Sequence, residues 1–280
     1  MSDAGDYVLG TAPPELERLR FQHQLWQPLV EQAWSRAGLR SGQRALDVGA
    51  GPGFVALDLA RWVGPSGRVL ALERSPAYVA SGQAMAQAAG LSQLELRQQD
   101  LLTDPWPTGP ADQPGAGFEL IWCRWVAMFL PQLEPWLVGL QRAIAPEGQL
   151  LVHEYMHWDT FGLHPHGEAI ARFGKACQRS FRQAGGDPDV NRRLPSLLAA
   201  RGWRIEHLQP LPVVGGTGSM AAQWMERFVL VYGPQLQRLG LWSEADQEQL
   251  QQEMALACRD PGSYWVGPTV LELRARAPQG

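Results

Sequence analysis

One stretch decides the fold of this chain, and it reads Arg44-Ala45-Leu46-Asp47-Val48-Gly49-Ala50-Gly51-Pro52-Gly53-Phe54. Its leucine and valine alternate as in a buried parallel strand. Its three glycines permit positive φ and let a ligand lie against bare main chain. From Phe54 to Trp62 the apolar residues follow helical spacing. The stretch therefore predicts a strand, a glycine turn and a helix N-terminus, which together can anchor a nucleotide-like ligand.

Two classes of ligand could use this turn. Residues 51–56 read Gly-Pro-Gly-Phe-Val-Ala and fit the dinucleotide fingerprint G-x-G-x-x-A. Asp47 argues against a dinucleotide, because a carboxylate at the end of the strand would repel a pyrophosphate. The same carboxylate suits a ligand that carries a cationic amine and a sulfonium. The run 46–53 closely resembles the first motif of class I S-adenosylmethionine-dependent methyltransferases.

Two later strands end in acidic residues that fit the same ligand. Glu73 ends the predicted strand 68–73, and an acidic residue there can accept both hydroxyls of a ribose. Asp100 follows the predicted strand 94–98. In the methyltransferase family, an acidic side chain at this position accepts from the adenine amino group, and the next backbone N–H contacts the ring. The resemblance therefore implies these roles for Asp100 and Leu101.

The fourth predicted strand, 118–125, resembles the family strand whose last residues line the sulfonium. The resemblance places the Cys123 backbone and Arg124 near the methionine part. Glu119 stands where the family usually carries Asp, and the Asp/Asn-Pro-Pro signature of amino-group and base methylation is absent, which disfavours a nucleic-acid substrate. The complete set of expected cofactor contacts is Tyr7, Gln22, Asp47, Gly49, Ala50, Gly51, Gly53, Glu73, Arg74, Asp100, Leu101, Cys123 and Arg124.

Strand and helix patterns alternate five times between residues 44 and 155. Right-handed crossovers make such a chain one parallel sheet with its ligands at the carboxyl ends of the strands. A further strand is predicted at 203–208, and a final strand at 269–275 fits the antiparallel strand that completes the family's sheet. We expect an α/β, Rossmann-like fold with a seven-stranded, mostly parallel sheet, a helical N-terminal lid and a helical cap.

The expected domain organisation follows from where this alternation stops. Residues 1–40 form the lid, and 41–155 form the cofactor-binding core. Residues 156–201 form a cap insertion, and 202–280 return to the core with a second helical insertion at about 215–262. Tyr7-Val8-Leu9-Gly10, followed by Glu15, Arg18-Leu19 and Gln22, resembles the lid of small-molecule methyltransferases, which folds over the cofactor; a helix that only packs on the sheet is the alternative.

Candidate bases lie at the end of the fifth predicted strand, 149–155. An alcohol, phenol or acidic carbon needs a base when it is methylated, and histidine is the usual one near neutral pH. His153, Glu154 and His157 are the candidates, although strand alternation turns only one of His153 and Glu154 toward the cleft. His164-Pro165-His166 lacks a third ligand, so we expect no metal site.

Aromatic residues are concentrated after the fifth strand. The stripe Trp224, Phe228 and Tyr232 has helical spacing and is more typical of a core than of a substrate wall. The cap nevertheless contains several of the twelve tryptophans, which hints at an aromatic pocket.

Composition restricts the possible partners. The net charge is −4, and Lys175 is the single lysine among 24 basic residues, so neither a nucleic-acid footprint nor a polybasic membrane patch is expected. The cysteines Cys123, Cys177 and Cys258 are widely spaced, the N-terminus is no signal peptide, and no apolar run is long enough for a membrane span. We expect a cytoplasmic protein; monomer and homodimer both remain open.

These observations predict a methyltransferase of the quinone-biosynthesis-like, small-molecule type. Its cofactor would be S-adenosylmethionine, and its acceptor an O, N or C nucleophile held under the cap. Two alternatives stay open. One is a protein or peptide methyltransferase, which would need an open groove. The other is a module that binds S-adenosylmethionine or a nicotinamide cofactor without transfer.

Overall fold

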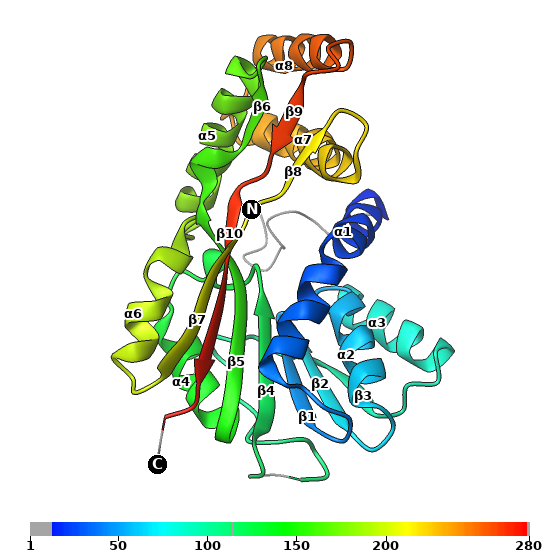
Figure 1. Ribbon diagram of the computed structural model, residues 1–280, viewed down its shortest axis with the longest axis vertical. Coiled ribbons are helices and arrows are strands. Elements are labelled where there is room, and N and C mark those ends of the chain that lie inside the picture. Colours follow the sequence, from blue (N-terminus) through cyan, green and yellow to red (C-terminus); the bar gives the residue numbers. More distant parts are fainter. Residues whose placement is uncertain (1–12, 114, 279–280) are drawn as a thin grey trace.

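The central sheet has the predicted architecture. The computed structural model describes residues 13–113 and 115–278. Within these, seven strands form a sheet of order β3-β2-β1-β4-β5-β10-β7 (Figure 1). The strands are β1 (Arg44–Val48), β2 (Arg68–Glu73), β3 (Leu94–Gln98), β4 (Phe118–Arg124), β5 (Ile144–His157), β7 (Arg204–Leu211) and β10 (Thr269–Arg276). β10 pairs antiparallel with both β5 and β7, while β1 to β5 are parallel, so the expected fold class is confirmed.

The strand order places a crevice at the end of β1. From β1 the chain proceeds to β2 and β3 on one side, and it crosses to β4 and β5 on the other. The connections on the two sides therefore diverge at the carboxyl end of β1, which is where open α/β sheets bind ligands. The glycine turn 49–53 lies at this point.

Helices cover both faces of the sheet. On one face, α1 (Pro13–Ala37), α2 (Phe54–Val63) and α3 (Pro76–Ala88) share a core with the odd-numbered residues of β1. On the other face, α4 (Glu134–Ala143) and α6 (Leu194–Ala199) share a core with the even-numbered ones. Strand alternation therefore puts Asp47 on the face that α1 covers.

One predicted helix boundary was wrong. Residues 130–144, which follow the fourth strand, have a sequence that predicts a helix from Leu130, but α4 begins at Glu134. A proline disfavours the helical conformation of the residue before it, so Pro131 keeps Leu130 extended. The preceding residues form a 3₁₀ turn, η1 (Ala127–Phe129), instead.

The cap contains a second sheet that the sequence did not reveal. β6 (Gly162–His164), β9 (Tyr264–Val266) and β8 (Val214–Gly216) form a three-stranded antiparallel sheet. Around it lie α5 (Glu168–Gln183), α7 (Met220–Arg238) and α8 (Glu244–Ala257). Each of these strands is three residues long, too short to show a period of two. The short turns η2 (Trp158–Thr160) and η3 (Val190–Arg192) complete this region.

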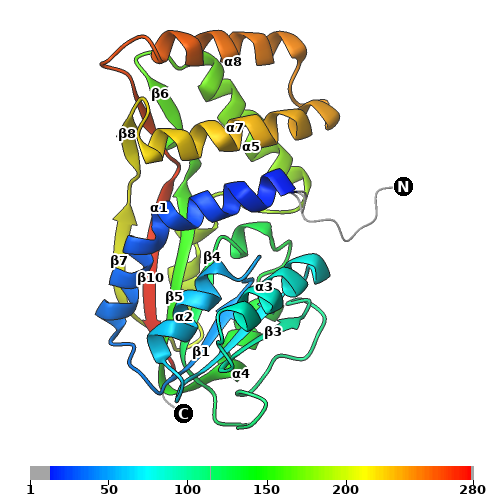
Figure 2. The ribbon, with the colours of Figure 1, turned by 90° about the vertical axis from the view of Figure 1, so that its right-hand side faces the viewer.

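Helix α1 lies between the sheet and the cap. Figure 2 shows α1, α7 and α8 one above another, with the sheet helices α2 and α3 below α1. The side-chain oxygen of Gln22 on α1 accepts from the indole N–H of Trp224 on α7 at 3.0 Å. Trp26 of α1 packs edge-on against Trp224 and Trp125, with ring centroids 5.7 and 5.1 Å apart. α1 thus connects the core and the cap over the carboxyl edge of the sheet.

Candidate functional site

An open cavity lies where the glycine turn, α1 and the cap meet. Its walls differ in character. One end carries the glycine turn and charged side chains, and the other end is aromatic. The lining residues used below are Arg18, Gln22, Asp47, Gly49, Ala50, Gly51, Trp122, Arg124, Trp125, Met128, Phe129, Tyr155, Trp158, Phe161, Phe181, Trp224 and Phe228.

The glycine turn has the backbone that the sequence requires. Gly49, Gly51 and Gly53 have φ values of 70°, 56° and 88°, which residues with side chains rarely adopt. A Cβ on Gly49 would lie 2.3 Å from a methyl group of Val126. At Gly51 it would meet nothing within 4 Å. The turn is therefore closed against protein at its first glycine and open to the cavity at its second.

Glu73 supports the open part of the turn. The N–H of Gly51 donates to its Oε2 at 2.9 Å, and the N–H of Ser75 donates to its Oε1 at 2.8 Å. Burial raises the pKa of Glu73, and these N–H donors oppose the rise. Each carboxylate oxygen has two lone pairs, so both can still accept a ribose hydroxyl. Glu73 thus ties β2 to the glycine turn, although it does not itself line the cavity.

Asp47 and Arg124 form the charged floor of the cavity. Asp47 is 2 % exposed, and burial raises its pKa to about 7, against the attraction of Arg124. Burial also lowers the pKa of Arg124 to about 10. Oδ2 of Asp47 and Nη1 of Arg124 are buried and have no hydrogen-bond partner within the described residues. Buried polar atoms are normally paired, so these two fit a zwitterionic ligand.

Arg18 is a cavity residue that the expected contacts did not include. It lies one helical turn before Gln22, and its Nη1 donates to the Gln22 side chain at 2.9 Å. Its guanidinium also holds the carboxylate of Glu15 through two bonds, at 2.7 and 2.8 Å. The i, i+4 spacing of Arg18 and Gln22 is the signal that could have identified it. Gln22 lines the cavity as expected, and Tyr7 lies outside the described residues.

Three of the remaining expected contacts, Arg74, Asp100 and Leu101, lie at the sheet edge beyond the cavity. Leu101 is buried, and the Asp100 carboxylate accepts from the N–H of Leu102 at 2.8 Å. Arg74 is exposed, and the Cys123 side chain is enclosed in the core on the face opposite Asp47. Ala50 lines the cavity through the glycine turn. Leu101, Asp100 and Arg74 follow β2 and β3, on the side of the turn where Glu73 lies.

The three candidate bases do not line the cavity. His153 is fully buried beneath Trp122, and its Nε2 lies 3.2 Å from the Glu272 carboxylate. Burial lowers its pKa. His157 is exposed. Glu154 points to the opposite face of β5 from His153, where it accepts from main-chain N–H groups. The positions of the two histidines therefore argue against the predicted role as base.

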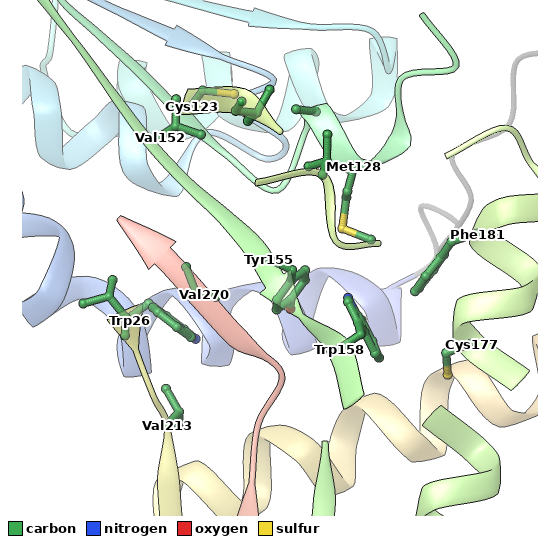
Figure 3. Close-up of a cluster of buried hydrophobic side chains, with 14 of the residues drawn as sticks. Trp26, Cys123, Met128, Val152, Tyr155, Trp158, Cys177, Phe181, Val213 and Val270 are labelled. Atoms are coloured by element: carbon green, nitrogen blue, oxygen red, sulfur yellow. The ribbon is translucent and has the colours of Figure 1, made fainter. Parts of the chain in front are cut away.

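The aromatic end of the cavity comes from distant parts of the chain. Trp125, after β4, is stacked between Tyr155 of β5 and Trp224 of α7, with centroids 5.5 and 6.2 Å away. Trp158 packs edge-on against Tyr155 and Phe181 (Figure 3). Of the α7 stripe, Trp224 and Tyr232 are buried in the core as expected, and Tyr232 is hydrogen-bonded to Ser180. Trp224 and Phe228 also line the cavity.

Comparison with known proteins shows the family. The model of the methyltransferase domain matches residues 39–185. The chain belongs to this family. It is 32 % identical over 179 residues to a demethylmenaquinone methyltransferase of Geobacillus kaustophilus, which covers 62 % of this chain and 72 % of the relative. The chain is therefore a methyltransferase, and its cofactor is S-adenosylmethionine, as the glycine motif implied.

Solved structures show the same fold at low identity. The YcgJ protein of Bacillus subtilis has a TM-score of 0.56 at 15 % identity, and the match covers 88 % of this chain and 96 % of that one. The [4+2]-cyclase SpnF has a TM-score of 0.57 at 20 % identity, covering 90 % of this chain and 82 % of the cyclase. A fold that also occurs in a protein named as a cyclase does not decide the reaction, so the activity rests on the family.

Proposed function

We propose that this methyltransferase methylates an apolar, ring-bearing small molecule, and that a naphthohydroquinone is the first acceptor class to test. One observation carries the proposal: a single cavity joins a charged end beside the glycine turn to an end built of aromatic faces. Aromatic and apolar walls favour flat apolar ligands. The name of the Geobacillus kaustophilus relative, a demethylmenaquinone methyltransferase, supports the same class.

The charged end fits the amino-acid part of S-adenosylmethionine. In this proposal Asp47 holds the ammonium group, while Arg18 and Arg124 supply positive charge for the carboxylate. Glu73 accepts the ribose hydroxyls, and Asp100 with the Leu101 N–H holds the adenine. The bound cofactor supplies an electrophilic methyl group on its sulfonium. The protein's contribution is then mainly to position the acceptor for an in-line attack and to exclude water.

The aromatic end holds the acceptor. Phe129, Phe181 and Phe228 present apolar surfaces, and the Tyr155 hydroxyl and the indole groups of Trp125 and Trp158 are the polar atoms among them. The indole N–H groups of both tryptophans are buried without a protein acceptor in the described part of the chain. An oxygen substituent on the acceptor ring would satisfy such a donor. A hydroquinone carries such oxygens, and its acidity reduces the need for a base on the protein.

Two expectations, about cellular location and about the class of partner, also belong to this proposal. No helix in residues 13–113 and 115–278 is long and apolar enough to cross a membrane. Cys123, Cys177 and Cys258 are all free thiols, which favours the cytoplasm as the site of action. We propose that the partner is a small molecule and not a nucleic acid.

The test is transfer of labelled methyl from S-adenosylmethionine to a 1,4-naphthohydroquinone that carries a short prenyl chain. The expected result is a labelled, singly methylated product. A short peptide mixture and an RNA serve as competing acceptors in parallel reactions. Label in either of these, and none in the hydroquinone, would contradict the proposal.

A further inference from the structure

Glu154 is the buried carboxylate next to the cavity that the proposed chemistry does not use. It is fully buried, and its Oε1 accepts from the main-chain N–H of Val126 and from that of Ala127, the latter at 2.7 Å. Its Oε2 is buried with no partner in the described chain. Both donors belong to the segment 125–128 that follows β4, here called the β4 turn. Two main-chain N–H groups that share one buried acceptor oxygen restrain the turn, because a buried donor left without a partner is costly.

The β4 turn carries a residue in an uncommon conformation. Trp125 has a φ of 52°, which is rare for a residue with a bulky side chain. Such conformations persist only where the surroundings enforce them, and they gather at functional sites. Here two sets of contacts enforce it. The ring is stacked between Tyr155 and Trp224, and the next two N–H groups are held by Glu154.

The same turn touches the cofactor side of the site. A methyl group of Val126 occupies the space beside Gly49 that a Cβ would need. Trp125 and Met128 line the aromatic end of the cavity. The β4 turn therefore lies between the two ends, with one residue against the glycine turn and two facing the acceptor space.

We propose that Glu154 is a positioning residue whose carboxylate fixes the β4 turn and thereby sets the aromatic wall and the glycine turn relative to each other. It acts through main-chain atoms and takes no proton from the acceptor. Burial on the face of β5 away from the cavity agrees with this role. So does the chemistry of the contact, since a neutral carboxyl or amide oxygen can accept the same two N–H groups.

The experiment compares Glu154→Gln with Glu154→Ala. The glutamine keeps an acceptor oxygen for both N–H groups, whereas alanine removes it. For Glu154→Gln we expect S-adenosylhomocysteine affinity within about two-fold of the wild type, and for Glu154→Ala a loss of about ten-fold or more. Near-UV circular dichroism reports the ring stack around Trp125, and we expect its signal to change in the alanine variant alone.

Glu253 provides a matched control. Its carboxylate also accepts two main-chain N–H groups, those of Ala169 at 2.7 Å and Ile170 at 3.3 Å, but in the cap. Glu253→Ala is expected to leave S-adenosylhomocysteine affinity unchanged. If Glu154→Ala does not fold, Glu154→Asp replaces it, because the shorter side chain withdraws the carboxylate from the turn, and the same loss of affinity is expected.

Two results would overturn the proposal. One is wild-type affinity and an unchanged near-UV signal in the folded alanine or aspartate variant. The other is a Glu154→Gln variant that binds S-adenosylhomocysteine normally but no longer transfers methyl to the naphthohydroquinone, which would mark Glu154 as a base. The binding and spectroscopic measurements need no acceptor. They therefore decide the role of Glu154 even if the hydroquinone is not the substrate.

Discussion

We expect Asp47→Asn to weaken S-adenosylhomocysteine binding and to raise the free energy of unfolding. The size of the second effect follows from the pKa of Asp47. The carboxyl group has an ordinary pKa of 3.8, and burial raises it to about 7 in the folded protein. Between these two values the unfolded chain is ionised at Asp47 while the folded chain keeps the proton. The folded state is thus favoured by low pH at this position, and this contribution is lost as pH rises through about 7.

Asparagine cannot ionise, so the variant keeps the stability that the wild type loses as pH rises. Each pH unit corresponds to about 1.4 kcal/mol, so the variant should gain up to about 4 kcal/mol of unfolding free energy over the wild type above pH 7. The gain should grow steadily between pH 5 and 7 and then level off. The same substitution removes the charge that faces the ammonium group, so S-adenosylhomocysteine affinity should fall by about 1.5–3 kcal/mol at pH 8.

The assay is urea unfolding followed by tryptophan fluorescence at several values from pH 5 to 8.5, combined with calorimetric titration of S-adenosylhomocysteine. Asp58→Asn on α2 is the control, because Asp58 is a carboxylate outside the cavity that pairs with His23 and Arg61. A stability difference between Asp47→Asn and the wild type that does not change with pH would refute the reasoning. So would undiminished affinity for the ligand.

Three further predictions follow from the site. Gly49→Ala should lower the unfolding free energy by roughly 1–3 kcal/mol, because its φ is 70° and the new Cβ would meet Val126; equal stability in urea would contradict this. Glu73→Ala should weaken S-adenosylhomocysteine binding by about 1–3 kcal/mol, since its carboxylate braces the Gly51 N–H; calorimetry that shows no change would remove Glu73 from the site. His157→Ala should retain kcat within about two-fold, because the side chain is exposed and outside the cavity; a loss of about a hundred-fold at unchanged KM would restore it as the base.

The glycine-turn end of the cavity could be predicted because its signals are local. Asp47 and Glu73 lie within the last two residues of β1 and β2, the glycine turn follows β1 directly, and parallel strands bring their carboxyl ends to one edge. Glu73 was expected from its position at the end of β2 taken together with the glycine turn. Its bonds to the N–H groups of Gly51 and Ser75 agree with that expectation.

The aromatic end of the cavity could not be predicted because it is assembled over long distances in the sequence. The stack around Trp125 needs Tyr155 of β5 and Trp224 of α7, which lie 30 and 99 residues further along the chain. The position of His153 could not be predicted for a different reason. It shares a face of β5 with Tyr155, which does reach the cavity, but it lies two residues deeper, under Trp122. Alternation predicts the face of a strand, whereas depth along it depends on what packs above.

The place of α1 has a thermodynamic consequence for how the affinities of two ligands depend on each other. One helix supplies Arg18 to the charged end of the cavity, and through Gln22 it holds Trp224 at the aromatic end. If one ligand orders this shared helix when it binds, the second ligand binds to a wall that is already ordered, and its affinity is higher. Such coupling is reciprocal, so whatever factor the donor adds to acceptor affinity, the acceptor must add to donor affinity. An affinity measured with one ligand alone therefore does not include this coupling factor.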